Sequence, residues 1–540
     1  CSSKNLFDFS IMGASLYTSL YPDKKPNIVF MFSDQQRYDT MAAYGADYMQ
    51  VPHLNQLSEE SFIFQNAYVA QPVCTPARAT IMSGLYPHTA GPIVNMINLP
   101  AEVKVISEMI SDEYYKGYMG KWHLGNDIER QHGFNVWKSS EDSHGTGYTH
   151  TQLNNETSSY TEYLIEKGHE PDKVPDIDGD NVAASPKFSL LGRKSGQRAP
   201  TFSSNAHYDM PEEDQMASYL AQEATKFIED NKDQPFVLYV STFEPHSPYH
   251  GPFMDQYDPA TIPVGPAFLE KPETASLVNR VRADYFMKFM LDGEDQTKDA
   301  YMMNYAANRE DVTTEAGWRQ LRAHYMANIT SVDNMVGTIN QAIKDNGLED
   351  NTIMVFTSEH GDMLGDHGML EKRSMFEESA RVPLLMKVPW LSKGNQVIEG
   401  SVGHIDLVPT LLDLIGQEVP DHLQGKSLKP VLEGESDLSE NDVFISWNGY
   451  DNNVPDRFLG DIKINRMLRL PWRTVVTPDR WKLALCAGDQ CELYDLNDDP
   501  YEQNNLFNDP DQQDRVRDMA ARIRVWQVQT GDTAPIPSTI

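Results

Sequence analysis

Three apolar runs, each ending in polar or charged residues, dominate the hydrophobic pattern of this chain. They occupy residues 26–34, 235–246 and 351–362 and are rich in Val, Ile and Phe. A continuous apolar run is typical of a strand that is buried on both faces of a mostly parallel sheet. Each run ends in Asp, Glu or His, and ligand sites in open α/β sheets gather at the carboxyl ends of the strands. The pattern therefore predicts where a functional site lies.

Helical patterns lie between these runs. Over residues 325–343 the apolar side chains recur at spacings of four and three and form one stripe, which is followed by Gly347, a residue type suited to the end of a helix. Pro211 and the two glutamates after it are a favourable opening for a helix over residues 216–231. Because strands alternate with helices, we predict an α/β sandwich.

Two parts of the chain depart from this alternation. Residues 139–205 are polar and rich in Ser, Asn, Gly and Asp, so we expect long loops over the site rather than a separate domain. After about Gly434 the pattern changes to short strands and then a helix over about 511–530, which indicates a second, smaller domain. We predict an N-terminal extension over 1–24, a large domain over 25–435 and a small C-terminal α+β domain over 436–540.

The net charge of the chain argues against some classes of function. The chain of 540 residues has 79 acidic and 45 basic side chains, a net charge of −34. This balance argues against nucleic-acid binding and against docking on anionic membranes. An acidic surface stays soluble where salt shortens the Debye length, which favours a periplasmic or secreted bacterial enzyme. No apolar run approaches the roughly 20 residues of a membrane-spanning helix, so we expect no membrane span.

Three of the four cysteines leave alternatives open. Cys1 fits the start of a processed, lipid-anchored lipoprotein, and it fits a trimmed chain equally well. Cys486 and Cys491 flank the turn of a predicted hairpin. A disulfide across that hairpin and two unpaired thiols are both consistent with the spacing.

The fourth cysteine, Cys74, stands at the predicted start of a helix. Thr75 after it is a suitable N-cap and Pro76 suits the first helical position, so Arg78 lies one turn into the helix. The positive end of the helix dipole favours anions at this place. A lone cysteine is most often a buried, inert thiol, and the neighbouring residues decide the matter here.

Residues 74–78, Cys-Thr-Pro-Ala-Arg, match the C-x-P-x-R signature of type I sulfatases, and residues 84–91 resemble the motif that follows it. Four further blocks resemble sulfatase blocks in the same order, at 119–125, 244–252, 357–385 and 491–506. The chain thus looks like bacterial polysaccharide sulfatases from Pro26 to about Leu506. The resemblance implies an alkaline-phosphatase-like fold, with a large mixed, mostly parallel sheet between helices and a smaller C-terminal domain with a short antiparallel sheet.

The resemblance also implies the chemistry. In that family the cysteine is oxidised to formylglycine, here by a formylglycine-generating enzyme or an anaerobic sulfatase-maturating enzyme. One hydroxyl of the hydrated aldehyde at Cys74 is then the nucleophile, and the other later expels sulfate. The basic residues that stabilise the hydrate, grip sulfate and protonate the leaving oxygen correspond to Arg78, Lys121, His123, His246 and Lys372. Lys121 and His123 alternate on an extended stretch and both can face the pocket, and either His123 or His246 is the general acid.

The metal ligands implied by the resemblance are Asp34, Gln35, Glu359 and His360. Carboxylate and amide oxygens suit Ca²⁺, whereas the imidazole is a softer ligand and makes Mn²⁺ the alternative. Gln35 and Glu359 depart from the family, which most often has Asp at both positions. Asp followed by Gln also occurs among relatives that hydrolyse phosphonate monoesters.

We therefore predict a sulfatase that hydrolyses sulfate monoesters on a sulfated carbohydrate. The alternatives are a phosphonate or phosphate ester hydrolase of the same superfamily, motivated by Gln35 and His360, and a catalytically silent carbohydrate-binding relative, motivated by Glu359. Trp472 is expected to stack on a sugar ring and the arginines to hold a second anionic group. The full set of expected substrate-binding residues is His144, His150, Arg193, Arg466, Trp472 and Arg473.

Overall fold

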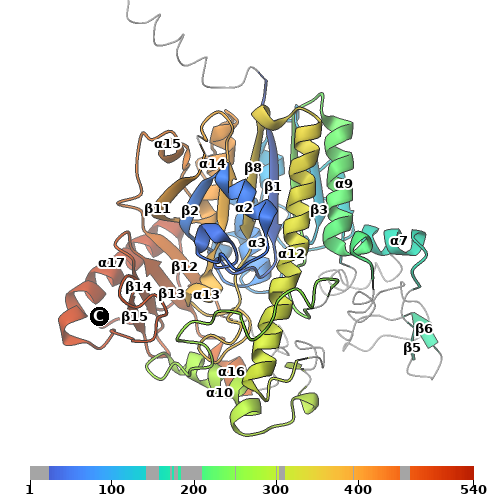
Figure 1. Ribbon diagram of the computed structural model, residues 1–540. Coiled ribbons are helices and arrows are strands. Elements are labelled where there is room, and N and C mark those ends of the chain that lie inside the picture. Colours follow the sequence, from blue (N-terminus) through green and yellow to red (C-terminus); the bar gives the residue numbers. More distant parts are fainter. Residues whose placement is uncertain are drawn as a thin grey trace, which may run out of the picture.

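The computed structural model describes residues 24–141, 157–170, 173–175, 181–183, 210–249, 251–299, 301–302, 310–392, 394–449 and 462–540. Within these ranges the chain forms a large sheet flanked by helices, and a smaller sheet close to its C-terminal end (Figure 1). The predicted fold class is confirmed.

The three apolar runs form neighbouring strands at the centre of the large sheet. They are β1 (Asn27–Ser33), β7 (Phe236–Ser241) and β8 (Thr352–Ser358), and β1 pairs in parallel with both others. Every residue of the three strands is buried, as continuous apolar runs predict. The register pairs Phe32 with Ser241 and Ser33 with Ser358, so the residues after the three strands reach one edge of the sheet together.

The large sheet is mixed but mostly parallel. Its order is β11-β2-β10-β8-β1-β7-β3-β4, and the short β9 pairs with β2. The antiparallel pairings are those of β10 with β2 and β8, and of β9 with β2. The remaining strands are β2 (Phe62–Tyr68), β3 (Tyr115–Gly120), β4 (Val136–Ser139), β9 (Arg381–Val382), β10 (Leu384–Lys387) and β11 (Gln396–Gly403).

Helices cover both faces of this sheet because side chains alternate along each strand. Val29 and Met31 of β1 belong to the core shared with α2 (Pro52–Glu59), α9 (Met216–Asn231) and α12 (Glu315–Asp345). The intervening apolar residues of β1 belong to a second core, shared with α3 (Cys74–Ser83) and α14 (Leu407–Leu414). Figure 1 shows α9 and α12 side by side in front of the sheet. Further helices are α4 (Pro87–Ala90), α5 (Ile106–Met109), α10 (Leu277–Leu291), α13 (Glu377–Ala380), α15 (Lys429–Leu432) and α16 (Ile462–Met467).

Two predicted helix starts differ from the structure. Helix α3 begins at Cys74 with Val73 as its N-cap, so Thr75 is not the cap. The Thr75 hydroxyl instead donates a hydrogen bond to the carbonyl of His123 at 3.0 Å. Helix α12 begins ahead of the predicted stripe, because the Thr314 side chain caps it by accepting from Gly317 N.

The C-terminal part forms the predicted antiparallel sheet. Its order is β12-β13-β14-β15, and α17 (Gln513–Thr530) packs on one face over Val475, Leu483 and Leu493. The other face, which includes Val476 and Tyr494, belongs to the core of the large sheet. The strands are β12 (Val443–Trp447), β13 (Trp472–Val476), β14 (Trp481–Leu485) and β15 (Glu492–Asp495).

The hairpin between β14 and β15 carries Cys486 and Cys491 as free, buried thiols. The backbone N–H of Cys486 points at the Cys491 sulfur at 3.4 Å, and burial raises the pKa of both thiols to about 11. Of the two interpretations that the spacing allows, this structure has the unpaired thiols.

The described part of the region expected to be long loops contains a helix, α7 (Ser159–Glu166), and the strand pair β5 (Lys173–Pro175) and β6 (Asn181–Ala183). The helix escaped prediction because its only buried apolar anchors are Tyr160 and Leu164, one turn apart. None of the helices in the described part of the chain combines the length and apolar composition needed to cross a membrane.

Candidate active site

Four buried side chains meet at the carboxyl edge of the large sheet. Asp34 follows β1, Glu359 and His360 follow β8, and Cys74 is the first residue of α3. One ligand atom from each residue lies within 4.8 Å of the others. All four are almost completely shielded from solvent. Such a group could hold a metal ion.

Two cations compensate the carboxylates of this cluster. The Lys121 ammonium lies 2.5 Å from Asp34 Oδ2, and Arg78 pairs through Nε with Glu359 and lies 3.7 Å from Asp34 Oδ2. Burial alone raises the pKa of Asp34, but Lys121 and other positive neighbours hold it well below its ordinary value. A second bond fixes Arg78, because its Nη1 donates to Ser241 Oγ at 2.7 Å.

His360 presents one ring nitrogen to the cluster. Its Nδ1 lies 3.0 Å from the Gly361 carbonyl, which accepts the proton of that nitrogen and leaves Nε2 to face the other residues. Nε2 lies 3.3 Å from Cys74 Sγ and 3.0 Å from Glu359 Oε1. Burial lowers the pKa of His360, but Cys74 and Glu359 outweigh it and raise the pKa to about 9.

The donor set of this cluster fits a divalent cation. It offers two carboxylates and one imidazole Nε2, and Asp34 Oδ1 is buried without a hydrogen bond from any described residue. Oxygen ligands suit Ca²⁺, and the imidazole suits Mn²⁺ as well. A cation would also balance the negative charge that raises the pKa of His360.

The remaining predicted ligand, Gln35, lies beside a second group of basic residues. Lys372 Nζ donates to Gln35 Oε1 at 2.5 Å and to His246 Nε2 at 3.1 Å. Because the ammonium can only donate, His246 Nε2 accepts, and His246 Nδ1 donates to the Ser247 carbonyl at 2.6 Å. Burial and the positive charge of Lys372 lower the pKa of His246 well below its ordinary value.

His123 is buried but does not lie on an extended stretch, contrary to the prediction. Strand β3 ends at Gly120, and His123 has a φ of 56°, in the left-handed region. The Asp127 carboxylate stabilises this turn by accepting the His123 N–H at 2.6 Å. The turn sets the His123 backbone against the start of α3, where Thr75 bonds its carbonyl.

The expected substrate-binding residues fall into three groups. His144, His150 and Arg193 lie outside the described residues. Arg466 is exposed on α16. Trp472 is 5% exposed within the core, and Arg473 is 2% exposed and pairs with Asp532 at 2.5 Å. Because Trp472 packs in the core of the large sheet and Arg473 is buried in its pair with Asp532, neither side chain is open to a ligand.

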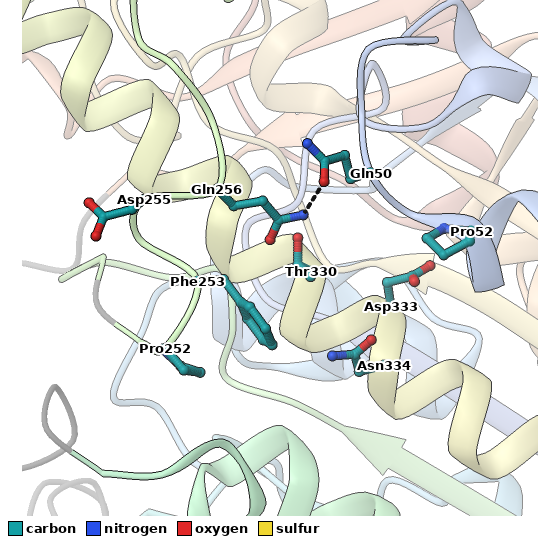
Figure 2. Close-up of a pocket in the computed structure, with 9 residues that line it drawn as sticks. All are labelled: Gln50, Pro52, Pro252, Phe253, Asp255, Gln256, Thr330, Asp333 and Asn334. Carbon is teal, nitrogen blue, oxygen red and sulfur yellow. Dashed lines mark hydrogen bonds between the residues drawn. The ribbon is translucent and has the colours of Figure 1, made fainter.

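A surface pocket of about 560 Å³ lies elsewhere, between the start of α2, helix α12 and the segment around Phe253 (Figure 2). None of the predicted site residues lines it. Asp333, in its wall, caps α2 by accepting the N–H of Leu54 at 2.7 Å. The lining residues are Gln50, Pro52, Pro252, Phe253, Asp255, Gln256, Thr330, Asp333 and Asn334. The candidate active site is therefore the buried cluster and not this pocket.

Two residues that contact the site were not predicted. Ser241 is the last residue of β7 and binds Arg78, and Asp362 binds Gln35 through its carboxylate. The signal for Asp362 was present, because it closes the third apolar run two residues after His360. Ser241 carried no such signal, since a serine at the end of a buried strand is unremarkable in sequence.

Two family models and several curated proteins match this chain. The family model described as Sulfatase matches residues 26–417, and the model described as N-sulphoglucosamine sulphohydrolase, C-terminal, matches residues 365–529. The ulvan-active sulfatase of Formosa agariphila is 27% identical, over 94% of this chain and 82% of the relative. The N-acetylglucosamine-6-O-sulfatase of Bacteroides thetaiotaomicron is 25% identical, over 95% of this chain and 88% of the relative.

Solved structures share the fold. One, determined with its substrate D-glucosamine-2-N,6-O-disulfate, has a TM-score of 0.70 at 23% identity and covers 95% of this chain and 99% of its own. The phosphonate monoester hydrolase of Silicibacter pomeroyi has a TM-score of 0.72 at 21% identity and covers 94% of this chain and 96% of its own. At these identities the likeness extends to the fold alone.

Proposed function

The chain belongs to the sulfatase family, and from this premise we propose that it removes sulfate from a sulfated carbohydrate by hydrolysis of a sulfate monoester. The observation that carries the proposal is the buried contact between Cys74 and His360, with Arg78 and Lys121 beside it. The relatives named for ulvan and N-acetylglucosamine sulfates support a carbohydrate as the substrate.

Cys74 is the residue that we assign as the precursor of formylglycine. When oxidised and hydrated, residue 74 supplies one hydroxyl as nucleophile and a second that releases sulfate as the aldehyde re-forms. Its position at the first turn of α3 supports this role, because the helix dipole stabilises negative charge there. The maturation partner is a formylglycine-generating or anaerobic sulfatase-maturating enzyme.

We assign the metal to Asp34, Gln35, Glu359 and His360, and we propose Ca²⁺ with Mn²⁺ as the alternative. The cation would neutralise charge on the sulfate oxygens. Arg78 and Lys121 supply fixed positive charge next to the nucleophile without needing to reorganise, since both are held by ion pairs in a buried site.

The proton for the leaving oxygen comes from the pair of His246 and Lys372. His246 Nε2 accepts from Lys372, so it holds no proton of its own at that atom. Transfer of the Lys372 proton to the leaving oxygen, directly or through His246 Nε2, gives an alcohol product and leaves the pair one proton short. Water restores that proton before the next turnover. We assign His123 to the same buried site, because its carbonyl accepts from Thr75 at the start of α3.

The net charge of the chain supports a location for the enzyme. A net charge of −34 suits a periplasmic or secreted bacterial enzyme, and we place the catalytic domain at 25–435 and the small domain at 436–540. A sulfated polysaccharide is repelled by such a surface, so we expect turnover of sulfated oligomers to persist or rise with moderate salt.

A second candidate keeps the site and changes the substrate. Gln35 and His360 are the two expected metal ligands that favour a phosphonate or phosphate ester hydrolase. A phosphonate monoester hydrolase also shares the fold. Comparing kcat/KM for an aryl sulfate and an aryl phosphonate separates the two. Faster phosphonate cleavage would favour the second candidate.

The test of the proposal is sulfate release from a panel of sulfated glycans and their oligosaccharides. The protein must first be shown by mass spectrometry to carry the aldehyde at position 74, and Cys74→Ala is the control. Release from one glycan class by the oxidised protein, and none by the control, identifies the substrate. If fully oxidised protein released sulfate from none of these glycans, the result would contradict the proposal that the substrate is a carbohydrate.

A further inference from the structure

We propose that Asp362 is a positioning residue that fixes the orientation of the side-chain amide of Gln35, with Nε2 toward Asp362 and Oε1 toward Lys372. The inference rests on the proposed function, in which Gln35 is a ligand of the cation. It concerns a residue with no assigned role, and it explains how this chain accommodates an amide where the family most often has a carboxylate.

Gln35 lies between an acceptor and a donor. Its Nε2 donates to Asp362 Oδ2, and its Oε1 accepts from Lys372 Nζ at 2.5 Å. All three side chains are buried, with exposed fractions of 0% for Gln35 and Asp362 and 2% for Lys372. The contacts therefore persist without competition from solvent.

The chemistry of the two neighbours leaves one orientation for the amide. The two ends of an amide are nearly equal in size, so shape does not distinguish them. An ionised carboxylate only accepts hydrogen bonds and an ammonium only donates them. Rotating the Gln35 amide by half a turn would place its oxygen against Asp362 and its NH₂ against Lys372, and both contacts would be repulsive.

Asp362 is itself firmly held. Its Oδ1 accepts the backbone N–H of Leu364 at 2.8 Å and of Glu371 at 3.0 Å, and its Oδ2 also accepts from Tyr249 OH at 3.0 Å. The backbone of Gln35 is fixed as well, because Tyr325 OH donates to its carbonyl at 2.7 Å. The Asp362 carboxylate is thus fixed in position and can orient the side-chain amide of Gln35.

Because Oδ1 and Oδ2 of Asp362 have different partners, one substitution can change the contact with Gln35 and keep the contacts with the backbone. Asp362→Asn keeps an oxygen for the Leu364 and Glu371 N–H groups and places an NH₂ where Oδ2 was. That NH₂ faces the NH₂ of Gln35, so the Gln35 amide either rotates or loses its partner. Rotation moves Oε1 away from Lys372, and loss of the partner leaves the contact with Lys372 as the one remaining restraint of these two on the amide.

The experiment is a double-variant cycle read out by calorimetric titration with Ca²⁺ and, separately, Mn²⁺. Asp362→Asn should raise the Kd for the cation about 10- to 100-fold, the range for groups that orient metal ligands. Gln35→Glu in the Asp362→Asn background moves the single carboxylate from position 362 to position 35, where one oxygen accepts from Asn and the other faces Lys372. The double variant should recover a Kd within about threefold of wild type, a recovery that a merely structural Asp362 would not show.

The matched control is Tyr249→Phe, which removes a second donor to Oδ2 and leaves the contact with Gln35 intact. It should change the Kd by less than about threefold. Melting temperatures of all variants report folding. If Asp362→Asn does not fold, a double variant that folds and binds the cation better than Gln35→Glu alone still supports the inference.

Two outcomes would overturn it, and they differ. Wild-type protein that binds neither cation would remove the proposed metal site, and the role of Asp362 with it. Wild-type protein that binds a cation, together with an Asp362→Asn variant of equal affinity or a double variant no better than Asp362→Asn, would overturn the role of Asp362 alone.

Discussion

The Cys74 sulfur lies 3.3 Å from Nε2 of His360, although 286 positions separate the two residues. The contact joins the start of α3 to the carboxyl end of β8 and places the proposed nucleophile directly on the proposed metal site. A cysteine in this position is not a core residue that happens to be buried, because three of its neighbours in the cluster are charged or titratable.

Replacing Cys74 by Ala should abolish sulfate ester hydrolysis. The side chain removed is the sole source of the nucleophile in the proposed mechanism, so kcat/KM should fall at least about 10³-fold. Steady-state assays with an aryl sulfate measure the loss. Cys486→Ala is the control, because it removes an equally buried thiol from the β14–β15 hairpin and should leave kcat/KM within about twofold. Equal activity of both variants would contradict the assignment.

Arg78→Ala should destabilise the protein and not only inactivate it. The change leaves Glu359 buried without its guanidinium partner and weakens the compensation of Asp34, which costs about 3–5 kcal/mol in the free energy of unfolding. Urea denaturation measures this loss. Saturating Ca²⁺ should reduce it, since a cation in the cluster replaces part of the missing charge.

The control for Arg78 is an exposed pair. Arg515 binds Asp479 with both side chains at least a third exposed, so Arg515→Ala should cost less than about 1 kcal/mol. Similar losses for the two variants, or an Arg78→Ala loss that Ca²⁺ leaves unchanged, would argue against a charge-balanced metal site.

The pKa of His246 should respond to Lys372. Burial and the Lys372 charge keep the pKa of His246 well below its ordinary value. In Lys372→Met the second cause disappears, so the pKa should rise, and His246 should become protonated at a higher pH than in the wild-type protein. NMR titration of ¹³C-labelled histidine rings measures this, with His246→Gln used to assign the signal. A His246 pKa that is the same with and without Lys372 would show that the two groups are not coupled.

The apolar strand pattern alone predicts the edge of the sheet at which the site lies, whereas the resemblance to sulfatases supplies residues such as Cys74 and Arg78. Asp34, Glu359 and His360 lie together because the carboxyl ends of parallel strands meet at one edge, and their role as metal ligands stays a prediction. The pairing of Arg78 with Glu359 was not predictable, because it depends on how α3 is set against β8 in three dimensions.

Trp472 and Arg473 were expected to contact a ligand, and the structure buries both side chains. Neighbouring residues on a strand point to opposite faces, and an exposed face is needed for a ligand contact. Sequence indicated a small sheet but not that one face packs on the large core and the other on α17. Both side chains are therefore buried, with exposed fractions of 5% for Trp472 and 2% for Arg473.

Stability should fall with rising pH because of Glu378 on α13. This side chain is 2% exposed, and its Oε2 accepts no hydrogen bond from a described residue. Burial, with the nearby charge of Asp366, raises its pKa to about 8, and Arg37 offsets only part of the rise. Between the ordinary carboxyl pKa and about 8 the folded protein therefore retains a proton that the unfolded chain has released.

The free energy of unfolding should therefore decrease across this pH window, with a slope of up to about 1.4 kcal/mol per pH unit for the one proton. Glu378→Gln removes the proton and should flatten the decline, so that the variant gains stability over wild type at pH 8 but not at pH 4. Urea denaturation at a series of pH values measures both curves, and their difference isolates Glu378 from other titrating groups. Glu399→Gln, on the exposed side of β11, is the control and should leave the curve unchanged. A Glu378→Gln curve parallel to that of wild type would mean that Glu378 is already ionised in the folded protein at neutral pH.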